Sequence, residues 1–200
     1  MIVAVVNLKG GVAKTTTAIA IATAAARAGA PARVLDADPQ GSASLWAELA
    51  EAAGDALPFD VEPANVTTVN RLARVRPAAG EWAVIDCPPS GKVADAAITA
   101  CDFAIIPTTP SAIDLQQSYA TAHTLEANDK PYALLVVRAD RRTLSFRATQ
   151  QAIAENGISC FDTTIPQREE IKGSFGRNFG DLGAYGDAYA ELVEAMRDGD

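Results

Sequence analysis

A glycine- and lysine-rich segment near the N-terminus is the feature that most constrains the fold of this chain. Residues 7–17 read NLKGGVAKTTT, directly after the apolar run 2–6 and at the start of a long helical pattern. A strand, a glycine turn and Lys-Thr at a helix start make a phosphate-binding loop. Glycines let backbone N–H groups approach phosphate oxygens, and the helix N-terminus adds partial positive charge. The segment therefore predicts a strand, a loop and a helix that together hold a phosphorylated ligand.

The lysines at the two ends of this loop have different expected roles. Lys14 can reach the β- and γ-phosphates, and the Thr15 hydroxyl can hold Mg²⁺. Lys9 lies too early in the loop to serve its own γ-phosphate, but it can reach a nucleotide held by a second copy of the chain. The alternative is a glycine turn with surface lysines, or a loop that no longer hydrolyses its ligand. The predicted nucleotide contacts are Gly10, Gly11, Val12, Ala13, Lys14, Thr15 and Thr16.

Composition narrows the class of protein. A chain of 200 residues that is 48% hydrophobic predicts one compact α/β domain over 1–200. No stretch approaches the length of a membrane span, and the first strand begins directly after Met1, so we expect neither a signal peptide nor an N-terminal DNA-binding domain. Three isolated cysteines suit neither a disulfide framework nor an iron–sulfur site. These features predict a cytoplasmic protein without a membrane partner.

Apolar strand-like runs alternate with helical patterns along the whole chain. This alternation predicts an α/β fold with a single doubly wound, mostly parallel sheet and helices on both faces, as in a P-loop NTPase. Ligands of such sheets bind beyond the carboxyl ends of the strands. The predicted strands are 2–7, 32–36, 82–86, 103–107, 132–137 and 161–164, and the predicted helices are 14–28, 42–53, 66–76, 92–100, 112–127, 144–155 and 184–197.

Acidic residues end two of these strands. Asp36 and Asp38 follow the second strand, and alternation along a strand points both to the same side. Asp86 ends the apolar run 82–86, which is the Walker B pattern, and its carboxylate is expected to hold Mg²⁺ through a water. The alternative for Asp36 and Asp38 is an acidic turn, with Gly41 as the break and Ser42 as the cap of the next helix. Beside a phosphate loop, the metal and water-handling interpretation is favoured.

Two later strands are also followed by polar segments. Residues 106–114 read IPTTPSAID, with Ser111 as a possible helix cap. Arg138 follows a buried strand, and its planar guanidinium could stack on a base and hydrogen-bond the base edge.

The net charge of −8 is unevenly distributed. Residues 36–62 hold seven acids and no Lys or Arg, whereas basic residues gather in 138–177. A local basic surface on an acidic chain suits nonspecific DNA binding, while the alternative is that these side chains cap helices or pair with nearby acids. The candidate DNA contacts are Arg141, Arg142, Arg147, Lys172 and Arg177.

The pattern KGGxxKTT with Lys9 resembles the deviant Walker A motif of the ParA/MinD family of dimerising ATPases, and the chain is most similar to the short, ParF-like partition ATPases. The D-x-D-P-Q-G segment at 36–41 resembles the family's first switch region, and the loop after Asp86 resembles the second. The resemblance implies that Asp38 positions the attacking water and that Asp36 supports the metal shell. It also implies an adenine-side loop that contains Pro166, Gln167 and Arg168.

One position departs from the family pattern, because Ala13 stands where the family usually has glycine. If the backbone there needs a positive φ, alanine costs about 1 kcal/mol. If φ is negative, alanine costs nothing.

The resemblance implies a nucleotide-switch ATPase for plasmid or chromosome partition. ATP and Mg²⁺ would bind each monomer, and two monomers would form a homodimer that binds DNA nonspecifically and associates with the nucleoid. A ParB-like or other small centromere-binding or adaptor protein would stimulate hydrolysis. The alternatives are a positioning ATPase for another cargo, a MinD-like membrane ATPase, a P-loop metabolic ligase, which would not need Lys9, and an electron-transfer relative, which would need paired cysteines.

Overall fold

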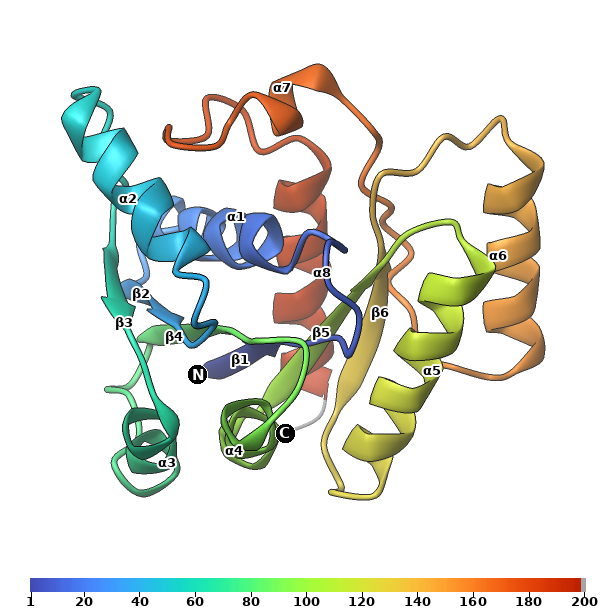
Figure 1. The fold of residues 1–200 in the computed structure, drawn as a ribbon, viewed down its shortest axis with the longest axis horizontal. Coiled ribbons are helices and arrows are strands. Elements are labelled where there is room, and N and C mark those ends of the chain that lie inside the picture. The colour runs from blue at the N-terminus through green and yellow to red at the C-terminus, as the bar shows by residue number, and fades with distance from the viewer. Residues whose placement is uncertain (199–200) are drawn as a thin grey trace.

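The computed structural model describes residues 1–198, except the side chains of Lys172 and Asp198. The described residues form one all-parallel sheet in the order β3-β2-β4-β1-β5-β6 (Figure 1). The strands are β1 (Ile2–Val5), β2 (Ala32–Asp36), β3 (Asp60–Pro63), β4 (Trp82–Asp86), β5 (Phe103–Thr108) and β6 (Tyr132–Val136). The helices are α1 (Lys14–Arg27), α2 (Ser42–Ala52), α3 (Val66–Arg74), α4 (Lys92–Ala100), α5 (Ala112–Glu126), α6 (Leu144–Glu155), α7 (Glu169–Lys172) and α8 (Ala184–Asp198).

Helices cover both faces of this sheet, and side-chain alternation along the strands builds two separate cores (Figure 1). Ile2 and Ala4 of β1 pack into the core that includes α3, α4, α5 and α6. Val3 and Val5 pack into the core that includes α1, α2 and α8. A strand buried on both faces needs apolar residues at every position, which explains the continuous apolar runs of the central strands. The predicted fold class is confirmed.

Most predicted elements are confirmed to within two residues at their ends, but the strand predicted at 161–164 is wrong. The chain there makes only single bridges, between Leu134 and Cys160 and between Ala139 and Pro166. The reason is a competing acceptor. Glu191 of α8 accepts hydrogen bonds from the backbone N–H groups of 162 and 163, at 2.6 and 3.1 Å, so these groups do not extend a ladder.

Two short elements, β3 and α7, are not predicted from the sequence. Strand β3 reads DVEP and pairs with β2 alone at the edge of the sheet. A short edge strand tolerates charges and a proline, so it lacks the apolar pattern that marks a strand in sequence. Helix α7 has one turn, which is too short for a periodic pattern.

Because the strands are parallel, the glycine loop and the acidic strand ends lie at the same edge of the sheet. In the strand register, Asp36 of β2 lies opposite Asp86 of β4, and Val5 of β1 lies opposite Asp86 on the other side. The loop that follows β1 therefore begins beside both carboxylates. This edge is the carboxyl end of the sheet, where the remaining strand-end loops also emerge.

Candidate functional site

A buried asparagine fixes the start of the glycine loop. The Asn7 side chain is fully buried and donates to Pro107 O at 2.8 Å and to Ser118 Oγ at 2.9 Å. Its Oδ1 accepts a hydrogen bond from Lys9 N at 2.9 Å, so the amide is satisfied at both ends. Asn7 was not among the residues predicted from sequence, although its place between a strand and a glycine loop is a signal that could have identified it.

Lys14 begins α1 and points back into the loop. Its side chain is buried, and Nζ donates to the carbonyl of Lys9 at 2.9 Å. Burial lowers the pKa of Lys14, while the nearby Asp86 and Asp38 carboxylates favour the charged form. The ammonium therefore sits inside the loop, opposite the acidic strand ends.

Asp86 is a buried carboxylate without a partner. The residue is 1% exposed, and neither of its oxygens has a hydrogen-bond partner among the described residues. Burial raises the pKa of Asp86 to about 7, with Asp36 adding to the shift. The Thr15 hydroxyl favours the charged form, but it does not reach hydrogen-bonding geometry. Native proteins rarely leave such a group unpaired unless a ligand completes it.

Only one of the two carboxylate oxygens of Asp36 has a hydrogen-bond partner among the described residues. Its Oδ2 accepts from Ser44 N at 2.8 Å and from Ser44 Oγ at 2.7 Å, which ties the first turn of α2 to the end of β2. Its Oδ1 is buried without a partner, facing the same region as Asp86. Thr15, Asp36 and Asp86 together offer one hydroxyl and three free carboxylate oxygens, a donor set that fits Mg²⁺. No cluster of three or more His, Cys, Asp or Glu forms a metal site within the described residues.

Asp38 lies beyond the end of β2 and is partly exposed. Its Oδ1 accepts from Gln40 N at 3.0 Å, and its carbonyl accepts from Gly41 N at 2.9 Å. Helix α2 then begins at Ser42, with Gly41 at the cap position in a left-handed conformation. The predicted capping role of Ser42 is therefore wrong by one residue. A glycine adopts the positive φ there without strain.

Ala13 does occupy a left-handed conformation, with φ 63° and ψ 33°. It caps α1 without a side-chain hydrogen bond. The cost of about 1 kcal/mol that the sequence analysis tied to a positive φ therefore applies. Strain of this kind persists only where the surrounding structure imposes the conformation.

Two adjoining cavities open at this edge of the sheet. One, of about 630 Å³, is lined by the glycine loop and by Asp38, Pro39, Gln40, Ser42, Pro88 and Pro89. The other, of about 280 Å³, is lined by Val137, Ile165, Pro166, Gln167, Arg168, Ile171 and Tyr185. We call them the phosphate cavity and the base cavity. Five residues line both of them: Ala13, Thr16, Trp46, Arg138 and Phe175. The two spaces are therefore continuous past these side chains.

The far end of the base cavity is built from two loops that pair with each other. Ala139 N donates to Ile165 O at 2.9 Å, and Gln167 N donates to Ala139 O at 3.2 Å. Arg138 is exposed and has a φ of 53°, which is unusual for a residue with a side chain. The structure thus brings Arg138, Pro166, Gln167 and Arg168, predicted from separate segments, to one cavity.

The base cavity is also lined by three residues that were not predicted from the sequence, Trp46, Phe175 and Tyr185. Trp46 follows the D-x-D-P-Q-G segment by one helical turn, a spacing that could have suggested it. Phe175 and Tyr185 come from the last quarter of the chain, and no local pattern there indicates a ligand site.

Residues 106–114 differ in detail from expectation. Ser111 occupies the cap position of α5, but its side chain makes no cap hydrogen bond. Instead, Thr109 Oγ1 donates to Asp114 Oδ2 at 2.6 Å and closes the loop.

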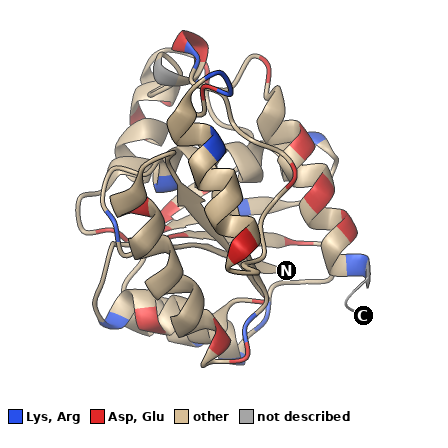
Figure 2. Ribbon diagram, turned by 90° about the vertical axis from the view of Figure 1, so that its right-hand side faces the viewer, with Lys and Arg blue, Asp and Glu red and all other residues tan. Residues whose placement is uncertain are grey.

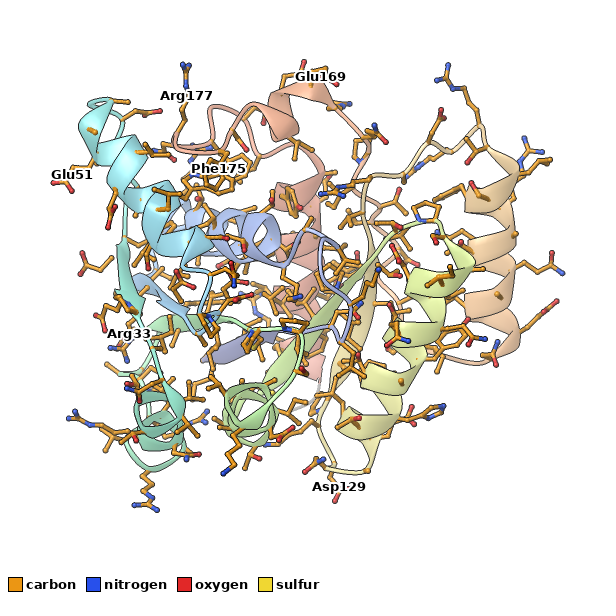
Figure 3. All side chains as sticks on the ribbon, in the orientation of Figure 1. Arg33, Glu51, Asp129, Glu169, Phe175 and Arg177 are labelled. Atoms are coloured by element: carbon orange, nitrogen blue, oxygen red, sulfur yellow. The ribbon has the colours of Figure 1, made fainter. Side chains whose placement is uncertain are left out.

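The predicted DNA contacts have mixed surroundings. Arg141 donates from Nε and a terminal nitrogen to Thr164 Oγ1, and Arg142 pairs with Asp140 at 3.0 Å. The alternative roles that the sequence left open, pairing and capping, are thus partly realised. Arg147 and Arg177 are exposed and have no side-chain partner within residues 1–198. Arg177 points away from the body of the molecule (Figure 3). The side chain of Lys172 lies outside the described part of the structure.

The sequence is similar to those of several known proteins. Residues 3–178 match the CobQ/CobB/MinD/ParA nucleotide binding domain. The chain is 39% identical to a maintenance of carboxysome distribution protein A from Gloeobacter kilaueensis, over 82% of this chain and 76% of that protein. It is 33% identical to the protein of the same name from Halothiobacillus neapolitanus, over 96% and 93%. A ParA protein of Rhizobium radiobacter is 27% identical over 87% and 82%.

Solved structures share the fold at low identity. The apo McdA structure from Cyanthece superposes with a TM-score of 0.78 at 17% identity, covering 96% of this chain and 98% of that one. The cell division ATPase MinD of Pyrococcus furiosus gives 0.79 at 18%, covering 97% and 98%. Cobyrinic acid a,c-diamide synthase of Mycobacterium smegmatis, solved with ADP and magnesium, gives 0.77 at 22%, covering 100% and 96%.

Proposed function

The chain belongs to the CobQ/CobB/MinD/ParA family of nucleotide-binding domains, and from this premise we propose that it is an ATP-dependent switch ATPase that positions a large protein assembly. The observation that carries the positioning role is the similarity, at 39% and 33% identity over most of the chain, to two proteins named for the distribution of carboxysomes. This corrects the emphasis of the sequence analysis, which put DNA partition first and positioning of another cargo second.

The nucleotide site supports hydrolysis of ATP with Mg²⁺. Lys14 binds the β- and γ-phosphates, and Gly10, Gly11 and Thr16 present backbone N–H groups to them. Thr15 and Asp86 hold Mg²⁺, which neutralises charge on the phosphates when bound. The orphaned, buried carboxylate of Asp86 supports this assignment, because a cation would complete it. Asp36 supports the metal side, and Asp38, next to the open cavity, orients the attacking water.

Lys9 provides the link between copies. Its backbone is held on both sides, by Asn7 at N and by Lys14 at O, while its side chain stays partly exposed. A lysine anchored in this way can extend to the phosphates of a partner's nucleotide. ATP then favours a homodimer, and hydrolysis releases it, because only the triphosphate completes the interface.

DNA is the matrix on which the dimer acts in this proposal. Among the candidate contacts whose side chains the structure describes, Arg147 and Arg177 are exposed without a side-chain partner, and Arg141 and Arg142 lie on the loop beside the base cavity. Doubling a weak basic surface in the dimer adds phosphate contacts that one monomer cannot make at once. A small adaptor on the cargo stimulates hydrolysis.

Membrane attachment is less well supported. Helix α8 carries Asp187, Glu191 and Glu194, and Figure 2 shows acidic positions recurring along the helix that leads to the C-terminus. Such a face opposes anionic lipid. Within residues 1–198, no helix combines the length and the apolar character that a membrane crossing requires.

The ATP switch is tested with two variants of purified protein. Asp38→Ala is expected to bind ATP, to form a stable dimer in light scattering and to release almost no phosphate. Lys9→Ala is expected to bind ATP as a monomer and to form no dimer. A normal ATP dimer of Lys9→Ala would overturn the exchange of lysines between copies, and loss of ATP binding by Asp38→Ala would make Asp38 a binding residue.

DNA binding is tested by the salt dependence of affinity with ATP present. The double variant Arg141→Glu, Arg142→Glu is expected to lose DNA while keeping dimer and ATPase. Each lost phosphate contact lowers the slope of log affinity against log salt by about 0.9. The matched control is Arg71→Glu, Arg74→Glu on α3, which changes net charge equally at exposed positions elsewhere. If wild-type protein with ATP and Mg²⁺ binds no DNA at low salt, the DNA role is wrong.

DNA partition is the second candidate, supported by the ParA similarity at 27% identity. The two functions separate in a deletion strain. Positioning predicts clustered protein assemblies and stable plasmids, whereas partition predicts plasmid or chromosome loss with normally spaced assemblies.

A further inference from the structure

A loop between α7 and α8 lies along α2, although more than a hundred residues separate them in the chain. We call residues 173–180 the strap. Trp46 Nε1 donates to the carbonyl of Arg177 at 2.8 Å, and Asn178 N donates to Asp55 Oδ2 at 3.0 Å. Between them, a methyl group added to Gly176 would come within 2.8 Å of Leu49 Cβ. Residues 176–178 of the strap are therefore fitted closely to α2 and to the turn that follows it.

Three aromatic rings join the strap to α2. Trp46 is 1% exposed, and its ring lies 5.2 Å from Phe175 and 5.8 Å from Phe179 between centroids. Phe179 is also buried, at 4% exposed. Phe175 is different, because 46% of it is exposed, and Figure 3 shows it between α2 and the strap. One ring of the three thus keeps a free surface, while the other two fill the core.

The free ring faces the ligand space. Phe175 and Trp46 line both the phosphate cavity and the base cavity, and Arg138 lines both as well. Most of the other side chains that line the base cavity are apolar or aromatic, among them Val137, Ile165, Pro166, Ile171 and Tyr185, and the polar ones include Gln167 and Arg168. An aromatic ring with a free surface and a guanidinium suit a flat, electron-rich heterocycle, which stacks on either.

We propose that Phe175, held in place by Trp46, is the wall that recognises the base of the nucleotide, and that base binding thereby steadies α2 and the Asp38 loop. This rests on the proposed nucleotide function. None of the phosphate-loop residues supplies this wall. It is made by α2 and by a segment near the C-terminal end of the chain.

Contacts of α2 connect Trp46 with Asp36 and with the Asp38 loop. Trp46 lies on the second turn of α2, and Ser44, two residues earlier, holds Asp36 through two hydrogen bonds. The Asp38 loop closes directly onto the start of the same helix, through Gly41 N and Asp38 O. A base packed on Phe175 therefore restrains Trp46, and Trp46 restrains the turn that holds both acids in place.

A packing role for Phe175 gives a different expectation. If its ring only shields Trp46 from water, its removal loosens the strap and weakens every ligand of the site to the same extent. If the ring recognises the base, its removal weakens nucleotides and leaves a ligand without a base unaffected.

The test is a calorimetric titration with Mg·ATP and with inorganic triphosphate plus Mg²⁺. We expect Phe175→Ala to bind ATP about tenfold more weakly than wild type, since stacking on an aromatic side chain contributes an effect of this order. Inorganic triphosphate should bind equally to both proteins, and Phe175→Tyr should restore ATP affinity. The matched control is Leu45→Ala, an α2 residue that is 47% exposed and lines neither cavity.

Equal weakening of both ligands, or no weakening of either, overturns the proposal. These outcomes differ from failure of the proposed function itself, in which the wild-type protein would bind neither ligand.

The link to α2 has its own readout, because Trp46 and Trp82 are the two tryptophans of the chain. Trp82 contacts Tyr189 and lines neither cavity. In Trp82→Phe protein, Trp46 fluorescence should change on adding Mg·ATP and not on adding inorganic triphosphate. An equal change with both ligands, or none with ATP, overturns the link.

Discussion

The phosphate end and the base end of this site are built in opposite ways. The phosphate end is built around one continuous loop, in which the buried side chains of Asn7 and Lys14 both hydrogen-bond to the backbone of Lys9. The base end is assembled from α2, two strand-end loops and the strap, and rings and apolar side chains line most of it. The charged groups of a site can thus come from one short segment of the chain, whereas the apolar walls that fit the shape of a ligand come from segments that only the fold brings together.

The largest expected effect removes the charge at the phosphate end. Lys14→Ala should lower Mg·ATP affinity by about a thousandfold, because several charge-assisted hydrogen bonds to phosphates are lost together. Calorimetry measures it, with Lys92→Ala as control, since Lys92 also begins a helix but lines neither cavity. If Lys14→Ala bound Mg·ATP with wild-type affinity, the assignment of the phosphate end would be wrong.

The next effect concerns the unpaired carboxylate. The folded pKa of Asp86 is raised from 3.8 to about 7, mainly by burial, so the folded chain keeps a proton that the unfolded chain releases between about pH 4 and 7. Stability without Mg²⁺ should therefore fall as pH rises through this window and level off above it. The loss is at most about 4 kcal/mol at 1.36 kcal/mol per pKa unit.

Asp86→Asn keeps the shape of the side chain and removes the charge. We expect it to match wild-type stability near pH 4, and to exceed it by an amount that grows up to about pH 7 and then levels off, in urea unfolding without Mg²⁺. A difference between the two proteins that does not vary with pH would show that burial of Asp86 is not the cause.

A smaller effect probes the base end. Arg138→Ala should weaken ATP about tenfold or less, as expected for one guanidinium stacked on a ring, and should spare inorganic triphosphate. Arg147→Ala is the matched control, an exposed arginine that lines neither cavity. If Arg138→Ala lowers the affinity for ATP and for inorganic triphosphate alike, Arg138 belongs to the phosphate end and not to the base end.

The smallest effect lies where the two ends meet. Ala13→Gly should raise the free energy of unfolding by about 1 kcal/mol, because glycine adopts φ near 63° without the steric penalty of a Cβ. Part of this gain is offset by the greater freedom of glycine in the unfolded chain. Thermal unfolding of the two proteins measures it, and a less stable glycine variant would mean that the Ala13 methyl contributes more by packing than its conformation costs.

The sequence predicted the fold, and it also predicted that the glycine loop and the strand-end acids would lie together, because the determinants of both are local. Apolar runs with intervening helical patterns indicated the parallel sheet, and strand-end acids indicated where Asp36 and Asp86 would lie. The strand expected at 161–164 was wrong because Glu191, from a distant helix, takes its N–H groups. Phe175 and Tyr185 were missed for the same reason, since only tertiary packing brings them to the cavity. From the sequence, the φ of Ala13 could be either positive or negative, and only the structure shows that it is positive.

We propose that one nucleotide spans both cavities. A crystal structure of the protein with Mg²⁺ and a non-hydrolysable ATP analogue tests it most directly. We expect phosphates at Lys14, Mg²⁺ beside Thr15 and Asp86, and the base between Arg138 and Phe175. A base that lies outside this cavity, with Phe175 still exposed to solvent, would contradict it.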